Sequence, residues 1–256
     1  MKKKILFCIT FFIIGIILEF KYLDKHVNLN IDDKYTSMIL EKVFLNKEEE
    51  KVKEINPTIY LYNTHDTEEY KSNNLFSFNP NVTMIKYVLK NELEKNNYKV
   101  LIEERSIKDL LNINNWSYNY SYKASRIYMD EISNQYNSIK YYIDIHRDSL
   151  EHDKTTITID NKDYAKLIFL IGLENPNYQD NLYFTEKINN KLNEYYPNLS
   201  KGIYKKGGPE VNGVYNQDKS PYAILVEFGG YENTTYEVLN SILAFSKCYI
   251  EVLNEG

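Results

Sequence analysis

The stretch IKYYIDIHRDS, from Ile139 to Ser149, joins a strand-like run to a cluster of polar groups. Residues 141–145 are β-branched or aromatic apart from Asp144, a composition typical of a buried or half-buried strand. Positions 146–148 then bring a histidine, an arginine and an aspartate, which are costly to bury unpaired. Because reactive side chains collect where strands of open α/β sheets end, His146 could be a metal ligand, a general base or a structural group.

The composition is that of an ordinary globular protein long enough to bury a sizeable core. Of its 256 residues, 26% are charged and 43% are hydrophobic. The net charge of −5 argues against a general nucleic-acid binder, which would present a basic face. Cys8 and Cys248 imply no disulfide framework, and neither has neighbours that would make it a metal ligand or a nucleophile.

Residues 1–20 predict a membrane segment. Three lysines precede an apolar run from Ile5 to Leu18, and no further charge appears until Glu19. The run is either a signal peptide or a short uncleaved anchor, because it is shorter than the ~20 residues of a typical span. We favour a single-pass anchor, since the following LEFKYLDKHV lacks the small residues that a signal peptidase needs. Lysines on the short cytoplasmic side predict that the bulk of the protein is extracytoplasmic.

Residues 21–56 form a polar region that includes KEEEKVKE, and we expect a solvated helix or a flexible tether there. The folded domain is then predicted to occupy residues 57–256. Its first elements are a strand at 58–63, a helix at 81–96 and a strand at 99–102. This strand–helix–strand order predicts an α/β fold with a mixed, largely parallel sheet flanked by helices.

Further elements follow from composition and periodicity. Strands are expected at 155–159, 166–171 and 222–230, helices at 125–135, 179–195 and 235–253, and loops at 112–126 and 202–221. Within the run 222–230 the strand itself is expected to end at Glu227, before the turn at Gly229 and Gly230. The loop at 202–221 is longer than a minimal connection, and loops of that length are often functional.

Three predicted strand ends carry side chains that suit a metal site. The first strand runs into His65, with Glu68 and Glu69 close behind, while the others deliver His146 and Glu227. Two histidines and a carboxylate can bind Zn²⁺ and leave a fourth position for water. A further carboxylate can then act as general base. Alternatively, Glu227 could simply form an ion pair or cap the glycine turn.

Several other chemistries lack their motifs. The sequence contains no HExxH helix motif, no G-x-S-x-G elbow and no Gly-rich phosphate loop after a strand. A thermolysin-type protease, a serine hydrolase of the α/β-hydrolase type and a nucleotide-binding protein are therefore not supported.

Five blocks of sequence resemble the stage II sporulation protein P family, which are peptidoglycan hydrolases of endospore-forming bacteria. In chain order they are THDTEEY at 64–70, SYNYSYKASR at 117–126, YYIDIHRDS at 141–149, LSKGIYKKGG at 199–208 and YNQDKSPYAILVEFGGYENT at 215–234. The resemblance covers about residues 57–253. The chain departs from the family pattern at Asn63, where many members have another histidine, and at PEVNG, which interrupts the run between the last two blocks.

The resemblance implies a fold similar to zinc-dependent N-acetylmuramoyl-L-alanine amidases. It also implies one Zn²⁺ ion on His65, Glu68 and His146, with Glu69 as the fallback ligand and Glu227 as catalytic base. The substrate would be the peptidoglycan amide between N-acetylmuramate and L-alanine of the stem peptide. Family members are also associated with cross-link endopeptidase activity and with a partner lytic transglycosylase during engulfment.

Roles for three more residues stay open. Arg147 and Asp148 could orient ligands or hold a peptide carboxylate, or they could form a structural salt bridge. Asn216 could line a substrate groove, although turn chemistry explains an asparagine there equally well. The main prediction is an anchored, outward-facing zinc amidase for spore engulfment or cell-wall remodelling. The alternative is a non-catalytic wall-binding scaffold of the same fold.

Overall fold

The computed structural model describes residues 55–71 and 79–255. The predicted anchor at 1–20, and the predicted tether up to residue 54, lie outside these described residues. Within the described ranges, none of the helices has the length and apolar character needed to cross a membrane.

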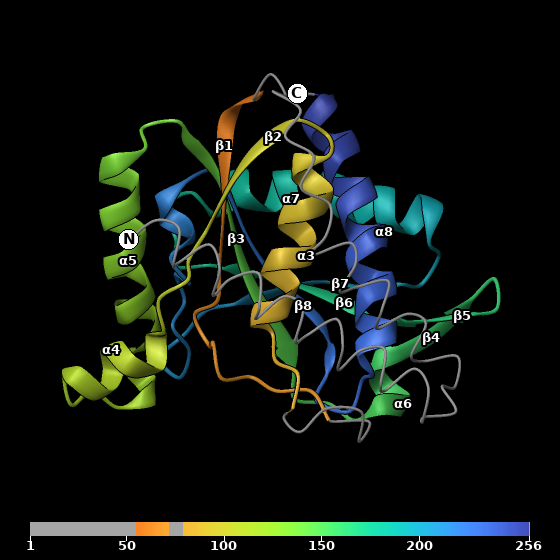
Figure 1. Ribbon diagram of the computed structural model, residues 1–256, viewed down its shortest axis with the longest axis horizontal. Helices are drawn as coiled ribbons and strands as arrows, with labels where there is room; N and C mark the ends of the chain where they lie inside the picture. Colours follow the sequence, from red (N-terminus) through yellow and green to blue (C-terminus); the bar gives the residue numbers. More distant parts are fainter. Residues whose placement is uncertain (1–54, 72–78, 256) are drawn as a thin grey trace, which may run out of the picture. The chain divides into compact units, whose positions relative to one another are not determined.

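The centre of the domain is a six-stranded sheet in the order β2-β1-β3-β8-β6-β7 (Figure 1). All neighbouring strands pair in parallel except β6 and β8, which are antiparallel. The prediction of a mixed, largely parallel sheet is therefore confirmed. The strands are β1 (Ile55–Tyr62), β2 (Tyr98–Ile102), β3 (Ile139–Asp148), β6 (Leu167–Gly172), β7 (Ser200–Lys206) and β8 (Tyr222–Gly230).

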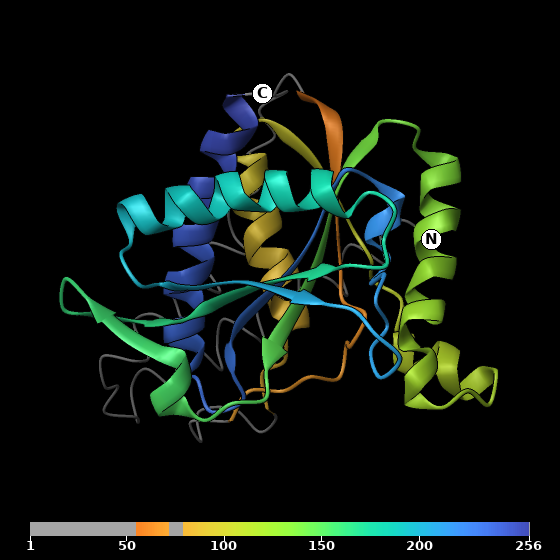
Figure 2. The same ribbon diagram turned by 180° about the vertical axis from the view of Figure 1, so that it is seen from behind.

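Helices flank this sheet. In Figure 1, α3 and α8 lie together on one side of the strands, while α5 lies with α4 on the other. Seen from behind, α7 runs beside β6 and β7 (Figure 2). The helical segments are α3 (Thr83–Glu94), α4 (Ile107–Ile113), η2 (Tyr118–Tyr120), α5 (Ser121–Gln135), α6 (His152–Thr155), α7 (Tyr178–Tyr195), η3 (Gln217–Lys219) and α8 (Thr235–Asn254).

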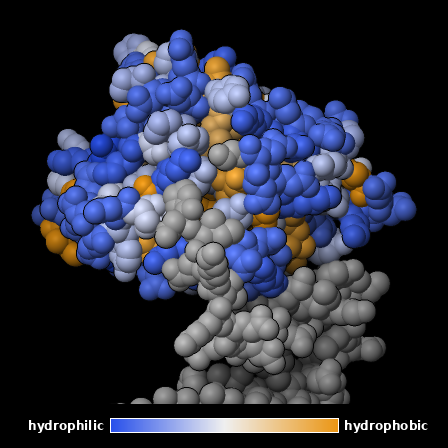
Figure 3. Space-filling view, turned by 90° about the horizontal axis from the view of Figure 1, so that it is seen from above, coloured by the Kyte–Doolittle hydropathy of each residue, from blue (hydrophilic) through white to orange (hydrophobic). Residues whose placement is uncertain are grey.

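Alternation along β3 decides which side chains meet which helices, because successive side chains of a strand point to opposite faces. Tyr142 packs with Met129 of α5, whereas Tyr141 contacts Phe184 of α7 and Tyr249 of α8. His146 has the same parity as Tyr142, so it lies on the α5 face. The coloured part of the face shown in Figure 3 is mostly hydrophilic, with hydrophobic residues in small patches.

Some predicted elements were wrong in extent or type. Residues 200–206 form strand β7 rather than the start of a loop; β7 lies at the sheet edge and is only partly buried, so polar residues are tolerated. Residues 112–126 were expected to be a loop, yet α4, η2 and the start of α5 occupy much of that range. β4 (Thr156–Ile159) and β5 (Lys162–Ala165) form a hairpin, of which only the first strand was predicted.

The strand ends also differ from the prediction. β3 continues through Asp148, and β8 continues through Gly230. His146 and Glu227 therefore lie within paired strands rather than in the loops that follow. Ladder hydrogen bonds and neighbouring strands stabilise the extended backbone past these polar side chains, which local composition does not reveal.

Candidate metal centre

The first two donors come from a turn that follows β1. The Glu68 N–H donates to the carbonyl of His65 over 3.2 Å, which closes the turn. Nδ1 of His65 lies 3.3 Å from Oε1 of Glu68, so the two side chains meet on the same side of it. Next to this turn, the buried Tyr70 hydroxyl donates to the Phe228 carbonyl of β8 over 2.7 Å. The turn is therefore tied to the central sheet.

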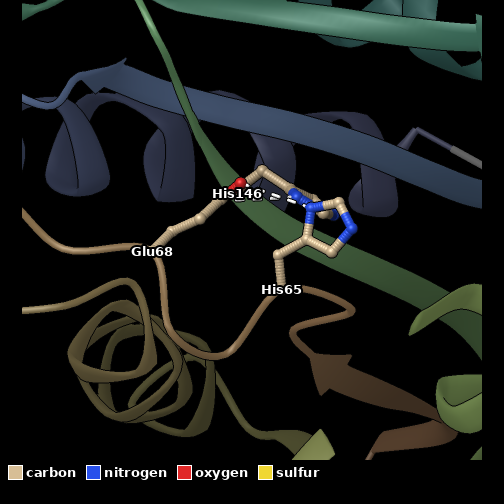
Figure 4. A group of neighbouring side chains, drawn as sticks. All are labelled: His65, Glu68 and His146. Carbon is tan, nitrogen blue, oxygen red and sulfur yellow. Dashed lines mark hydrogen bonds and ion pairs between the residues drawn. The ribbon is translucent and has the colours of Figure 1, made fainter. Parts of the chain in front are cut away.

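His146 of β3 supplies the third donor. Its side chain is buried, and its Nδ1 lies 3.6 Å from Oε2 of Glu68 (Figure 4). One ligand atom from each of His65, Glu68 and His146 can be chosen so that all three lie within 4.8 Å of one another. Glu69 is exposed, and its carboxylate accepts from Asn79 instead. The geometry thus brings Glu68 to the two histidines and leaves Glu69 outside the group.

The charges around this group suit a cation. Burial by itself would raise the pKa of Glu68, but hydrogen bonds from His146, His65 and the Arg147 N–H lower it overall. Burial by itself would lower the pKa of His146, but the carboxylates of Asp144 and Glu68 raise it well above its usual value. Two carboxylates beside a buried imidazole favour a positive charge, which a divalent ion can supply. Two nitrogens and one oxygen form a donor set that Zn²⁺ commonly takes.

Glu227 lies beside this group. It pairs with His146 in the register of β3 and β8, and paired residues of neighbouring strands share a face. Its side chain is half-buried, and burial raises the pKa of its carboxyl group even though nearby His146 acts to lower it. Its position is that of a carboxylate adjacent to the donors, outside the three-residue cluster itself.

Arg147 and Asp148 have different partners, and Asp148 forms the structural ion pair that the sequence left open. The Arg147 guanidinium donates to the carbonyls of Glu69 and Asp148. The Asp148 carboxylate lies 3.5 Å from Nζ of Lys201 instead. The main-chain N–H of Arg147 donates to Oε2 of Glu68 over 3.0 Å, so this residue orients a donor through its backbone.

Asn216 and Asn63 both serve internal hydrogen bonds. Asn216 is buried and adopts a left-handed backbone conformation with φ 56°, as turn asparagines often do. Its amide donates to the Tyr122 carbonyl and to Oγ of Ser125, each over 2.9 Å. Asn63 donates to the Ile145 carbonyl over 2.7 Å. Neither amide is directed at bulk solvent.

Sequence reasoning overlooked two residues at the centre. Asp144 is fully buried, and its Oδ1 lies 2.9 Å from Nε2 of His146. The signal was present, because a lone aspartate two positions before His146 must share its face of the strand. Tyr118 of η2 stacks on His65 with 4.6 Å between ring centroids. No periodic pattern in the Asn- and Tyr-rich segment indicated that contact.

Other surface hollows lie away from the metal group. One of about 410 Å³ is lined by residues such as Tyr141, Phe184 and Tyr222. Tyr141 and Tyr222 stand near the amino ends of β3 and β8, whereas His146 and Glu227 stand towards the carboxyl ends. We therefore do not assign this hollow to the metal group.

Together, the sheet and the His–Glu–His group define an α/β protein with a candidate metal centre beside a half-buried carboxylate. A family model described as stage II sporulation protein P (SpoIIP) matches residues 23–249. The chain belongs to that family, as the five sequence blocks predicted.

A curated relative agrees with this family. The chain is 32% identical over 202 residues to stage II sporulation protein P of Bacillus subtilis (strain 168). The match covers 76% of this chain and 50% of the relative, so the chain spans about half the length of that protein.

Solved structures support the fold. The CwlD amidase from Clostridioides difficile, in complex with the GerS lipoprotein, aligns with a TM-score of 0.51 at 15% identity. The alignment covers 78% of this chain and 100% of that one, and it confirms the predicted amidase-like fold. Cwp6 from Clostridium difficile aligns with a TM-score of 0.44 at 13% identity, over 77% of this chain and 29% of that one. We draw no conclusion from the second alignment.

Proposed function

We propose that this chain is a zinc-dependent peptidoglycan hydrolase that acts in sporulation. The proposed reaction is hydrolysis of the amide between N-acetylmuramate and L-alanine of the stem peptide. The observation that carries the proposal is the convergence of His65, Glu68 and His146 within 4.8 Å, beside the half-buried Glu227. Membership of the SpoIIP family and an amidase-like fold support it.

The three donors would hold one Zn²⁺ ion. Bound zinc supplies Lewis-acid polarisation of the scissile carbonyl and favours ionisation of water. Glu227 would take a proton from the attacking water and later deliver it to the leaving amine nitrogen, so that a carboxylic acid and a free amine result. The raised pKa of Glu227 suits a group that must both accept and return a proton.

Further parts of the proposal concern the setting of the enzyme. We propose that residues 1–20 anchor the protein, that residues 21–56 act as a tether and that residues 57–256 work on the extracytoplasmic side. Cross-link endopeptidase activity and a partner lytic transglycosylase belong to the same proposal. The CwlD amidase, a structural neighbour, is in complex with the GerS lipoprotein, which makes a protein partner for this fold a reasonable part of the proposal.

The test is muropeptide analysis of peptidoglycan incubated with the detergent-solubilised full chain and Zn²⁺. We expect the wild type to release free stem peptides and leave unsubstituted glycan strands. Glu227→Gln should lower the rate by about 10²- to 10⁴-fold, because the proton acceptor is lost while the shape is kept. Glu69→Gln is the matched control, since Glu69 neighbours the ligands without joining the group, and it should retain full activity.

The scaffold alternative predicts a different outcome. If the wild type sediments with peptidoglycan but releases nothing at any Zn²⁺ concentration, the chain is a wall-binding module. Release of cross-bridge fragments instead of whole stem peptides would show that the chain is an endopeptidase rather than an amidase.

A further inference from the structure

A buried carboxylate lies directly behind the candidate metal ligand His146. Asp144 stands two residues earlier on the same face of β3 and is fully buried. Its Oδ1 accepts from the Thr64 N–H over 2.9 Å, and its Oδ2 accepts from the Thr64 hydroxyl over 2.7 Å. A carboxylate in the interior is costly unless it is paired and hydrogen-bonded. Such a group in an otherwise apolar strand therefore calls for a role.

Asp144 contacts the side of the imidazole that faces away from the other donors. Its Oδ1 lies 2.9 Å from Nε2 of His146, whereas Nδ1 is 3.6 Å from Oε2 of Glu68. The Nε2–Oδ1 distance is that of a strong charge-assisted contact, although the ring N–H is not directed along the line to that oxygen. A proton on Nε2 leaves Nδ1 as the free lone pair, which is the form that a metal ligand needs.

The contact continues away from the metal group as a chain of buried hydrogen bonds. Thr64 Oγ1 lies 3.0 Å from Oγ of Ser125 on α5, and the Asn216 amide donates to that same Oγ over 2.9 Å. A hydroxyl has one hydrogen, and Thr64 gives its own to the carboxylate of Asp144. The one hydrogen of the Ser125 hydroxyl has two acceptors within reach, Oγ1 of Thr64 at 3.0 Å and the Tyr122 carbonyl at 3.2 Å. Ser125 therefore lies in hydrogen-bond contact with Thr64 and links it to the Asn216 amide.

We propose that Asp144 is a positioning residue that orients His146, and that Thr64, Ser125 and Asn216 hold Asp144 in turn. These buried hydrogen bonds connect four parts of the fold: the turn after β1, helix α5, strand β3 and the segment before η3. They explain why Asn216 is buried in a left-handed turn rather than exposed toward solvent. The inference rests on the proposed function, because it concerns the same metal site.

The test measures metal affinity rather than turnover. The detergent-solubilised full chain is titrated with Zn²⁺ against a chromophoric chelator, and Co²⁺ is then bound so that its visible spectrum reports the coordination geometry. We expect Asp144→Ala to weaken Zn²⁺ binding by about 10- to 100-fold, the usual effect of removing a group that orients a ligand. The Co²⁺ spectrum should change as well, because His146 is free to rotate.

Two milder variants should weaken Zn²⁺ binding by less than Asp144→Ala does. Asp144→Asn keeps an oxygen for His146 and can donate to Thr64, so its affinity should fall between those of the wild type and Asp144→Ala. Thr64→Val keeps its main-chain donor but loses the hydroxyl, and should weaken binding by less than Asp144→Ala. The control is Ser241→Ala on α8, whose buried hydroxyl donates to the Ala165 carbonyl over 2.6 Å and does not contact the metal group. It should bind Zn²⁺ as the wild type does.

The outcomes separate the two proposals. Wild-type affinity and an unchanged Co²⁺ spectrum in Asp144→Ala would overturn the positioning role while leaving the metal site intact. A wild type that binds no Zn²⁺ would overturn both. If Asp144→Ala does not fold, as judged by circular dichroism, the order of Asp144→Asn and Thr64→Val against the wild type decides the question, and equal affinities in all three would reject the inference.

Discussion

Tyr118 covers the imidazole of His65 from the solvent side. The rings stack with 4.6 Å between centroids and 30° between planes, while 55% of the tyrosine remains exposed. Its phenol ring restricts His65, which otherwise stands on a turn. An aromatic contact of this kind contributes about 0.5–1.5 kcal/mol beyond simple burial.

We therefore expect Tyr118→Ala to weaken Zn²⁺ binding by about two- to tenfold, as measured by chelator competition. Tyr118→Phe keeps the ring and should match the wild type. Equal affinities in Tyr118→Ala and the wild type would mean that His65 is held by other contacts.

At the level of single residues, the sequence indicated the candidate metal ligands better than the residues that hold those ligands in place. His65 and His146 were predicted by type and by position after strands, the family resemblance favoured Glu68 over Glu69, and the structure brings the three together. The choice between Glu68 and Glu69 depended on spacing, which the turn at His65 now explains. Asp144 was noticed only as an exception in an apolar strand, since its partners are distant in sequence.

Among the described helices, α8 has the most complete N-terminal capping pattern. The Thr234 hydroxyl accepts from the Glu237 N–H over 3.2 Å, and the Glu237 carboxylate accepts from the Thr234 N–H over 2.8 Å. This capping box lies just after β8, the strand that carries Glu227.

Thr234→Ala should lower the free energy of unfolding by about 1 kcal/mol, because the first turn of α8 loses its hydroxyl acceptor. Urea denaturation followed by circular dichroism measures the change. Thr234→Ser restores the acceptor and should recover most of the loss. A fully stable Thr234→Ala would show that the remaining contacts of α8 fix its first turn.

Elements with an apolar face were predictable, and elements defined by their neighbours were not. β1, β3, β8 and α7 appear close to their expected positions, because their hydrophobic runs face the core. β7 has lysines and a glycine, and it is extended because β6 offers it a ladder. The β4–β5 turn uses Asp160 and Asn161 at φ 49° and 59° in place of the usual glycine signal.

For the molecule as a whole, the buried tyrosines among the 25 in the sequence contribute strongly to the dependence of stability on alkaline pH. Burial raises the pKa of a set of them, namely Tyr60, Tyr62, Tyr70, Tyr122 and Tyr249. Above the ordinary value of about 10, the unfolded chain releases these protons while the folded chain keeps them. The folded state then binds more protons, so stability falls as pH rises.

Ionisation of Lys86 has the opposite effect on stability, over a lower pH range. Burial lowers its pKa to about 8 from the model-compound value of 10.5. Between these values the unfolded chain binds more protons, so stability rises with pH. Burial also raises the pKa of the Cys248 thiol from 9.0 to about 12, which lowers stability as pH rises above 9. We therefore expect a shallow rise from pH 8 to 9 and a steep fall above 10, at up to ~1.4 kcal/mol per pH unit for each buried tyrosine.

Urea midpoints at intervals from pH 8 to 11 test this profile, and the part of the tyrosinate absorbance that comes from the buried tyrosines should appear together with unfolding. Lys86→Met should remove the rise and keep the fall. A stability that stays level above pH 10 would contradict the role of the buried tyrosines.

The pairing of β3 with β8 has a consequence for how this fold can change. His146 and Glu227 occupy paired positions, and neighbouring strands lie about 4.8 Å apart whatever side chains they carry. A one-residue slip in either strand would send one of the two to the opposite face. Insertions in the surrounding loops leave that spacing untouched. Such a framework can therefore acquire new specificities through its loops while the spacing of His146 and Glu227 stays constant.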